Sequence, residues 1–188
     1  MTSRIGLIGL LTVLFTSSPA LAEVPYPTVD FQGEWVLSDD NGNIAHAEMH
    51  YSADQKKMRI KMQQQGMEMS SVRDMTSGEM LMWSNQMPGM AMRLPTPAGD
   101  EFDAEPTDEV KTIGSETCTI WKMKEVEACL TEENIPVQTS GMGFGASLEN
   151  IERITQDAGL FSVPEGVTIR DMPMTMPGAA GIGKGLPF

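Results

Sequence analysis

Methionine recurs at alternate positions through the first half of the chain. Seventeen of the 188 residues are Met, and eleven of these lie between Met49 and Met92, in runs such as 67–69 and 80–82. Residues two apart point to the same side of a β-strand. The spacing therefore predicts strands that carry methionine on one side. It constrains this half of the chain to a sheet with a methionine-lined face.

Turn-forming residues separate these alternating runs at regular intervals. Asn41-Gly42 is a strong short signal for a β-hairpin, and Gly66 and Gly78 mark further turns. Strands are expected at 31–38, 44–51, 57–63, 67–74, 79–84 and 90–94. Short strands at this spacing favour an antiparallel meander over βαβ units.

The second half of the chain begins with a change of composition. Residues 95–108 are rich in Pro, Asp and Glu and are expected to form a long solvated loop. Further strands are expected at 110–113, in a hairpin between the two cysteines, and at 135–139. The glycine-rich segment 141–145 is expected to act as a hinge.

One helix is expected after this hinge. Ser147 can cap a helix that runs to about Ala158, because Leu148, Ile151 and Ile154 then share one helical face. A sheet with an apolar face must cover that face. The expected fold class is therefore mainly β (α+β): a curved antiparallel meander sheet or half-barrel, with one C-terminal helix packed on or into it.

The first 22 residues have the pattern of a secretory signal peptide. Arg4 supplies a positive start, 5–15 an apolar stretch too short to span a bilayer, and 20–22 a small-x-small cleavage site. Cleavage is expected after Ala22, which predicts a periplasmic or secreted protein without stable membrane insertion. The rest is expected to divide into an N-terminal extension at 23–30, a single β-rich domain at 31–171 and a flexible Met/Gly/Pro tail at 172–188.

The chain is strongly acidic, with a formal net charge of −13 at pH 7. Nucleic-acid binding needs clustered Lys and Arg, which the sequence lacks, so nucleic acid is not expected as a partner. The usual hydrolase and metalloprotease motifs do not occur, and no carboxylate pair has a spacing suited to acid–base work. The protein is therefore not expected to be an enzyme.

The two cysteines, Cys118 and Cys129, are expected to form a disulfide. If the hairpin turns at Met123-Lys124, Trp121 opposes Val126 and the two cysteines oppose each other directly. Exported proteins fold in an oxidising compartment, which favours the bridge. The alternatives are a thiolate metal pair or a redox dithiol, but no Cys-x-x-Cys motif supports them.

The motif His46-x-Glu48-x-His50 resembles a metal site only if it is helical. On a strand, the two histidines are about 13 Å apart, at roughly 3.3 Å per residue, which is too far for one shared ion. A solvated outer face is the preferred interpretation.

The methionines support two interpretations. A soft, flexible side chain can line an apolar surface, or it can donate sulfur to Cu(I). The residues expected to line a ligand groove are Met58, Ile60, Met62, Met67, Met69, Met80, Met82, Met90 and Met92. The alternatives for these residues are a fully packed core or Cu(I) binding. The tail methionines Met172, Met174 and Met176 have no obvious core to fill and are the main candidates for a Cu(I) site.

Several short motifs resemble the domain of unknown function 4412 family. They include 42–51, Lys57-Met58-Arg59-Ile60, 72–75 and 160–166, and the resemblance covers roughly 31–169. It implies an exported bacterial protein and brings no catalytic residues with it. The expected architecture also resembles that of the periplasmic lipoprotein localisation factors, whose half-barrel cradles lipid around a helical lid.

Together these features predict a non-enzymatic periplasmic protein. We expect it to bind or carry an apolar ligand, an acyl chain or a lipidated partner, in the methionine-lined concavity. A lipid or lipoprotein is then the expected partner, and no cofactor is required. The first alternative is a copper-handling protein that uses its Met-x-Met motifs for Cu(I), and the second is a structural envelope protein without a ligand.

Overall fold

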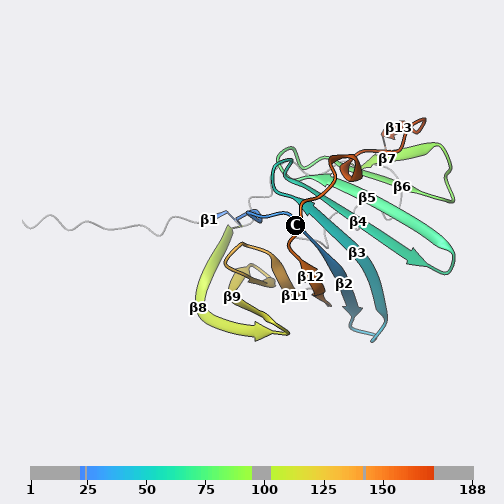
Figure 1. Ribbon diagram of the computed structural model, residues 1–188. Coiled ribbons are helices and arrows are strands. Elements are labelled where there is room, and N and C mark those ends of the chain that lie inside the picture. The colour runs from blue at the N-terminus through green and yellow to red at the C-terminus, as the bar shows by residue number, and fades with distance from the viewer. Residues whose placement is uncertain (1–21, 24, 95–102, 142, 172–188) are drawn as a thin grey trace, which may run out of the picture.

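A single curved sheet contains almost all of the regular structure (Figure 1). The computed structural model describes residues 22–23, 25–94, 103–141 and 143–171. Its elements are β1 (Ala22–Glu23), β2 (Phe31–Asp39), β3 (Ile44–Ser52), β4 (Lys57–Gln64), β5 (Met67–Asp74), β6 (Met80–Ser84), β7 (Met90–Leu94), β8 (Asp103–Ile113), β9 (Glu116–Met123), β10 (Val126–Leu130), β11 (Pro136–Gly141), β12 (Phe144–Glu152), the short 3-10 helix η1 (Ala158–Phe161) and β13 (Thr168–Asp171).

The strand order is β1-β8-β9-β10-β11-β12-β2-β3-β4-β5-β6-β7-β13. β1 pairs with β8 at one edge of the sheet. The chain then enters the middle of the sheet at β2, runs outward to β7, and continues from β8 back to β12, which lies on the other side of β2. Neighbouring strands are antiparallel except β13, which pairs with β7 in parallel. The predicted mainly β fold class with a curved antiparallel meander is therefore confirmed, and the sheet is open.

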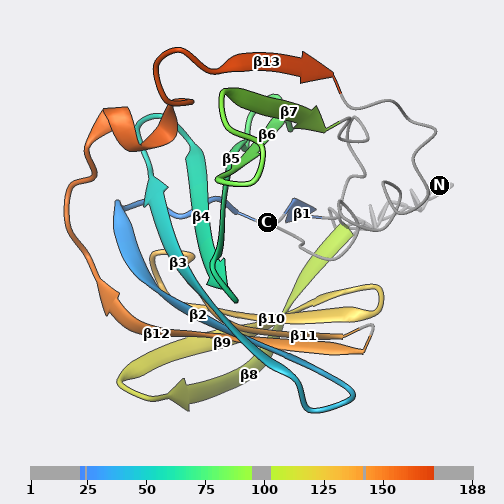
Figure 2. The ribbon, with the colours of Figure 1, turned by 90° about the vertical axis from the view of Figure 1, so that its right-hand side faces the viewer.

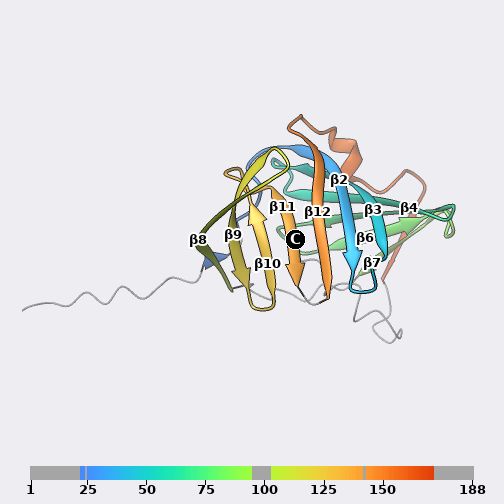
Figure 3. The same cartoon turned by 90° about the horizontal axis from the view of Figure 1, so that it is seen from below.

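The sheet bends so that its two halves share one core. Phe31, Trp35 and Tyr51 from β2 and β3 belong to the same buried cluster as Met123 and Leu130 from β9 and β10. Figure 2 shows β8 to β12 and β2 across the base of the molecule and β4 to β7 rising to one side. Viewed from below, β8 to β12 and β2 lie side by side (Figure 3). The clustered side chains therefore lie on the concave side, which we call the inward face.

The predicted helix from Ser147 to Ala158 is wrong. Residues 144–152 form β12, in which Ala146 pairs with Leu37 and Leu148 with Trp35. The ladder shifts between Glu149 and Glu152, and Asn150 has a φ of 52°. This bulge inserts extra residues, so Leu148 and Ile151 both pack against the core although they are three residues apart. The three-residue spacing that suggested a helix is therefore the spacing of a bulged strand.

The predicted loop at 95–108 is also partly wrong. Residues 95–102 lie outside the described residues, but β8 begins at Asp103. Glu105 pairs with Lys122 and Pro106 with Trp121, and the ladder then shifts before Val110. Proline is tolerated near a strand edge or a bulge, so the Pro-rich composition misled the prediction.

The predicted disulfide between Cys118 and Cys129 is confirmed, with Cα atoms 5.3 Å apart. The predicted register is wrong, because Trp121 pairs with Ala128 and Cys129 with Ile120. The hairpin turns at Lys124-Glu125, where Lys124 has a φ of 49°. A shift of two residues keeps each side chain on its own face, so the cysteines still meet, but diagonally.

The segment after β12 crosses the outer side of the sheet. Gln156 Oε1 lies 2.9 Å from Nδ1 of His50, and Arg59 donates to the Leu160 carbonyl at 3.0 Å. Phe161 of η1 is only 3% exposed. The chain then reaches β13 beside β7, where Arg93 makes ion pairs with Glu79 and Asp171.

Candidate ligand-binding face

The nine residues that the sequence assigns to a ligand groove all lie on the inward face. The register shows this directly, because residues paired across neighbouring strands point to the same side. Met62 pairs with Met69, and Met82 pairs with Met92. The other five residues lie two or four positions from one of these methionines on the same strand, so they point to the same side. We call this set the methionine face: Met58, Ile60, Met62, Met67, Met69, Met80, Met82, Met90 and Met92.

The members of this face differ in their contact with the core. Met58 is 4% exposed and belongs to the core, and Ile60 and Met62 pack against that core. Ile60 and Met62 are themselves half-buried, as are the other six, Met67, Met69, Met80, Met82, Met90 and Met92. The two interpretations of the methionines, a packed core and a ligand lining, therefore apply to different residues. The residues on β4 belong to the core or contact it, whereas the methionines on β5 to β7 are only partly covered by the described residues.

Ser71 and Arg73 are among the polar residues of the same face that the sequence reasoning missed. Ser71 pairs with Ile60 and Met82, and Arg73 pairs with Met58 and Met80. Both continue the alternation that begins at Met67, and this alternation could have identified them. Burial is the main cause that lowers the pKa of Arg73, and the nearby Tyr26 acts in the opposite direction.

Residues 25–30 fix the end of the face where Arg73 lies. The Tyr26 hydroxyl donates to the Met75 carbonyl at 3.0 Å, and the Asn134 side chain donates to the Tyr26 carbonyl at 3.2 Å. Asp30 accepts from the backbone of Ala53 at 2.7 Å. These bonds hold the N-terminal segment against the ends of β4, β5 and the 131–135 turn.

Tyr51 lies in the same row as Arg73, two strands away, and stacks on Phe31 with ring centroids 5.5 Å apart. Its side chain is 0% exposed, and its hydroxyl has no hydrogen-bond partner within the described part of the chain. Burial, with smaller effects from Tyr26 and Asp30, raises the pKa of Tyr51 to about 12. The hydroxyl therefore stays protonated and is a potential donor.

The motif His46-x-Glu48-x-His50 lies on the outer face, but the prediction that it is fully solvated needs correction. His46 is exposed, with Nδ1 2.7 Å from Glu34. His50 is only 9% exposed, because Gln156 from the crossing segment covers it while its Nε2 lies 2.7 Å from Glu48. A segment distant in sequence buries His50, which strand alternation cannot reveal. Among the described residues, no three His, Cys, Asp or Glu side chains are grouped so that they could hold a metal ion.

The tail methionines Met172, Met174 and Met176 lie outside the described residues, as do 1–21 of the expected signal peptide. Within the described ranges, none of the helices has the length and apolar character needed to cross a membrane. The disulfide is typical of proteins that fold in an oxidising compartment.

No family model and no curated protein matches the chain, so the resemblance to the domain of unknown function 4412 family stays a prediction. Solved structures do match. A structure of PNGF-II superposes with a TM-score of 0.55 at 10% identity, over 78% of this chain but only 31% of PNGF-II. An uncharacterized conserved protein from Thermus thermophilus superposes with a TM-score of 0.54 at 9% identity, over 77% of this chain and 91% of that one.

A LolA superfamily protein from Nitrosomonas europaea is also similar, at 8% identity over 74% of this chain and 93% of that one. Its TM-score of 0.41 is too low to support an inference. At these identities, the matches to PNGF-II and to the Thermus protein show a shared fold alone. The class they define is an open, curved antiparallel sheet.

Proposed function

We propose that the protein is a non-enzymatic periplasmic binding protein that carries an apolar ligand, an acyl chain or a lipidated partner, on the methionine face. The observation that carries this proposal is the set of six half-buried methionines on one concave side of the sheet. Methionine side chains can repack around ligands of different shape. The disulfide supports an oxidising compartment such as the periplasm.

The available burial is large enough to matter. Full burial of a Met side chain contributes about 1.5–3 kcal/mol, so covering six half-buried ones would contribute roughly 5 kcal/mol. The ligand adds about 0.8 kcal/mol for each buried CH₂ group. These gains must exceed the cost of association, which is about 4–15 kcal/mol. The gain from a long acyl chain exceeds the upper end of this range, whereas the gain from a short one falls within it.

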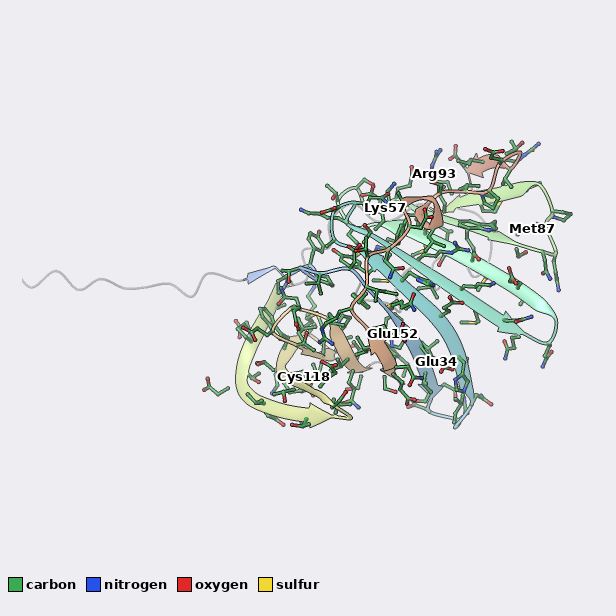
Figure 4. All side chains as sticks on the ribbon, viewed as in Figure 1. Glu34, Lys57, Met87, Arg93, Cys118 and Glu152 are labelled. Carbon is green, nitrogen blue, oxygen red and sulfur yellow. A yellow bond between two sulfur atoms is a disulfide. The ribbon has the colours of Figure 1, made fainter. Side chains whose placement is uncertain are left out.

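A charge placed on the methionine face tests the proposal. Met82→Glu should weaken binding of a fluorescent long-chain acyl probe by at least about tenfold, because a carboxylate on the face must be desolvated. Met87→Glu is the matched control, since Met87 lies exposed at the turn between β6 and β7 (Figure 4). Equal probe binding by the wild type, Met82→Glu and Met87→Glu, or no binding by any of them, would contradict the proposal.

The second candidate is Cu(I) binding, and one observation favours it. Met62 faces Met69 and Met82 faces Met92 directly across neighbouring strands, so two thioethers in each pair could reach one soft ion. Leucine keeps the apolar surface but has no sulfur. A Met62→Leu/Met69→Leu/Met82→Leu/Met92→Leu variant, which removes both pairs, should therefore keep acyl binding under the carrier proposal and lose Cu(I) under the copper proposal.

A further inference from the structure

The methionine face contains one charge, and its position is informative. Arg73 is the single charged side chain on the inward face of β3 to β7, all of whose residues are described. The other residues of that face are uncharged: most are Met or another apolar residue, and the polar ones are Tyr51, Gln64, Ser71 and Ser84.

The other charged side chains of these strands lie on the outer face, on β3, β4, β5 and β7. Lys61 lies there beside Glu68, with Nζ and Oε2 3.4 Å apart, and Arg59 lies over the ring of Trp83 at 5.8 Å. Charges are thus segregated to the outer side, with Arg73 as the exception. Burial disfavours the charged form of a side chain, so an arginine at this position costs folding energy.

Further polar groups lie at the same end of the face. Tyr51 shares the row of Arg73, and its fully buried hydroxyl has no hydrogen-bond partner among the described residues. Ser71 is the next inward-facing residue along β5. An arginine and a protonated tyrosine hydroxyl are both donors, and they suit an anion and not a cation.

The rest of β5 provides a path for an apolar chain. From Arg73 the inward-facing residues are Ser71, Met69 and then Met67, near the exposed turn at Gln65. Six residues of strand span about 20 Å, at roughly 3.3 Å per residue. This is the length of an extended long-chain acyl group.

We propose that the ligand is a long-chain fatty carboxylate, whose head group binds Arg73 while its chain lies along the methionines of β5 and β6. Arginine is suited to this role because its planar guanidinium can make two parallel hydrogen bonds to one carboxylate. The inference rests on the proposed function, since it names the class of ligand for the same face.

Palmitate and hexadecanol, which share a chain length and differ in the charge of the head group, test this inference. Their affinities are measured by competition with a fluorescent apolar probe, at a pH where the carboxyl group is ionised. Wild-type protein should bind palmitate about tenfold more tightly than hexadecanol, as expected for a charge-assisted hydrogen-bonded pair. Arg73→Met should abolish that difference by weakening palmitate binding much more than hexadecanol binding, and Arg73→Lys should restore part of the difference.

Lys61→Met is the matched control, because it removes one positive charge from the outer face of the neighbouring strand. Retention of the palmitate preference in this variant supports the inference. Equal binding of palmitate and hexadecanol by the wild type would overturn the assignment of a fatty carboxylate as the ligand. An equal loss of the palmitate preference in Arg73→Met and Lys61→Met would do the same. Either result would leave the proposed apolar carrier standing. Failure of the wild type to bind either compound would overturn the proposed function, and the inference with it.

Discussion

Gly141 shows how a single residue fixes the packing of three strands. It pairs with Val126 of β10 and with Phe144 of β12, and its φ is +144°. A Cβ atom at this position would collide with the Glu125 carbonyl oxygen and lie 2.8 Å from the Val126 Cα. The glycines expected to form a hinge therefore include one that allows close approach of two backbones.

Gly141→Ala should destabilise the fold strongly, because the colliding atoms belong to the backbone and cannot rotate away. We expect the free energy of unfolding in urea to fall by about 2–4 kcal/mol. Gly114→Ala is the control, since Gly114 has a φ of +60° but open space around it, and should cost about 1 kcal/mol. A similar loss in both variants would show that the conformation matters and the close approach does not.

At the scale of elements, Arg153, which directly follows β12, forms ion pairs with two other parts of the second half of the sheet. Its Nη2 lies 2.7 Å from Glu116 at the start of β9, and its Nε lies 3.3 Å from Glu133 in the turn after β10. Hydrogen bonds from this guanidinium are the largest cause that holds the pKa of both carboxyl groups below the usual value.

This pair of contacts predicts a pH dependence of stability. A carboxyl group with a lowered folded-state pKa contributes stability above its unfolded-state pKa, and that stability is lost as the pH falls through the folded-state pKa. Arg153→Met should therefore cost about 1 kcal/mol at neutral pH and less below about pH 4, where the wild type loses the same contacts. Urea unfolding across this pH range measures it, and a cost independent of pH would contradict the ion-pair account.

The elements that the sequence predicted well are those set by local alternation. The strands 67–74 and 90–94 and the inward position of their methionines follow from period two alone. The predicted β9–β10 register was wrong by two residues. The predicted and the observed hairpin place each side chain on the same face of the sheet, so alternation cannot distinguish them, and only the turn conformation at Lys124 does. The helix error arose because a bulge near Asn150 imitates helical spacing.

At the scale of the whole molecule, the decisive features are non-local. Nothing in the sequence of β12 shows that it pairs with β2, although this pairing joins the two halves and makes the sheet curve around a shared core. The burial of His50 by Gln156 depends on a segment 106 residues away. The candidate site was therefore predictable as a set of side chains on one face. Which of its members contact the core, and the alignment of Arg73 with Tyr51 across the strands, were not predictable.

Native mass spectrometry of the protein purified from its own compartment tests the central claim most directly. If the methionine face carries an acyl ligand, the spectrum should show the polypeptide with an added mass in the lipid range, and excess palmitate should displace it. Met82→Glu should lose this added mass, whereas Met87→Glu should keep it. A bare polypeptide mass that binds no added palmitate, or one that gains only copper on addition of Cu(I), would contradict the account.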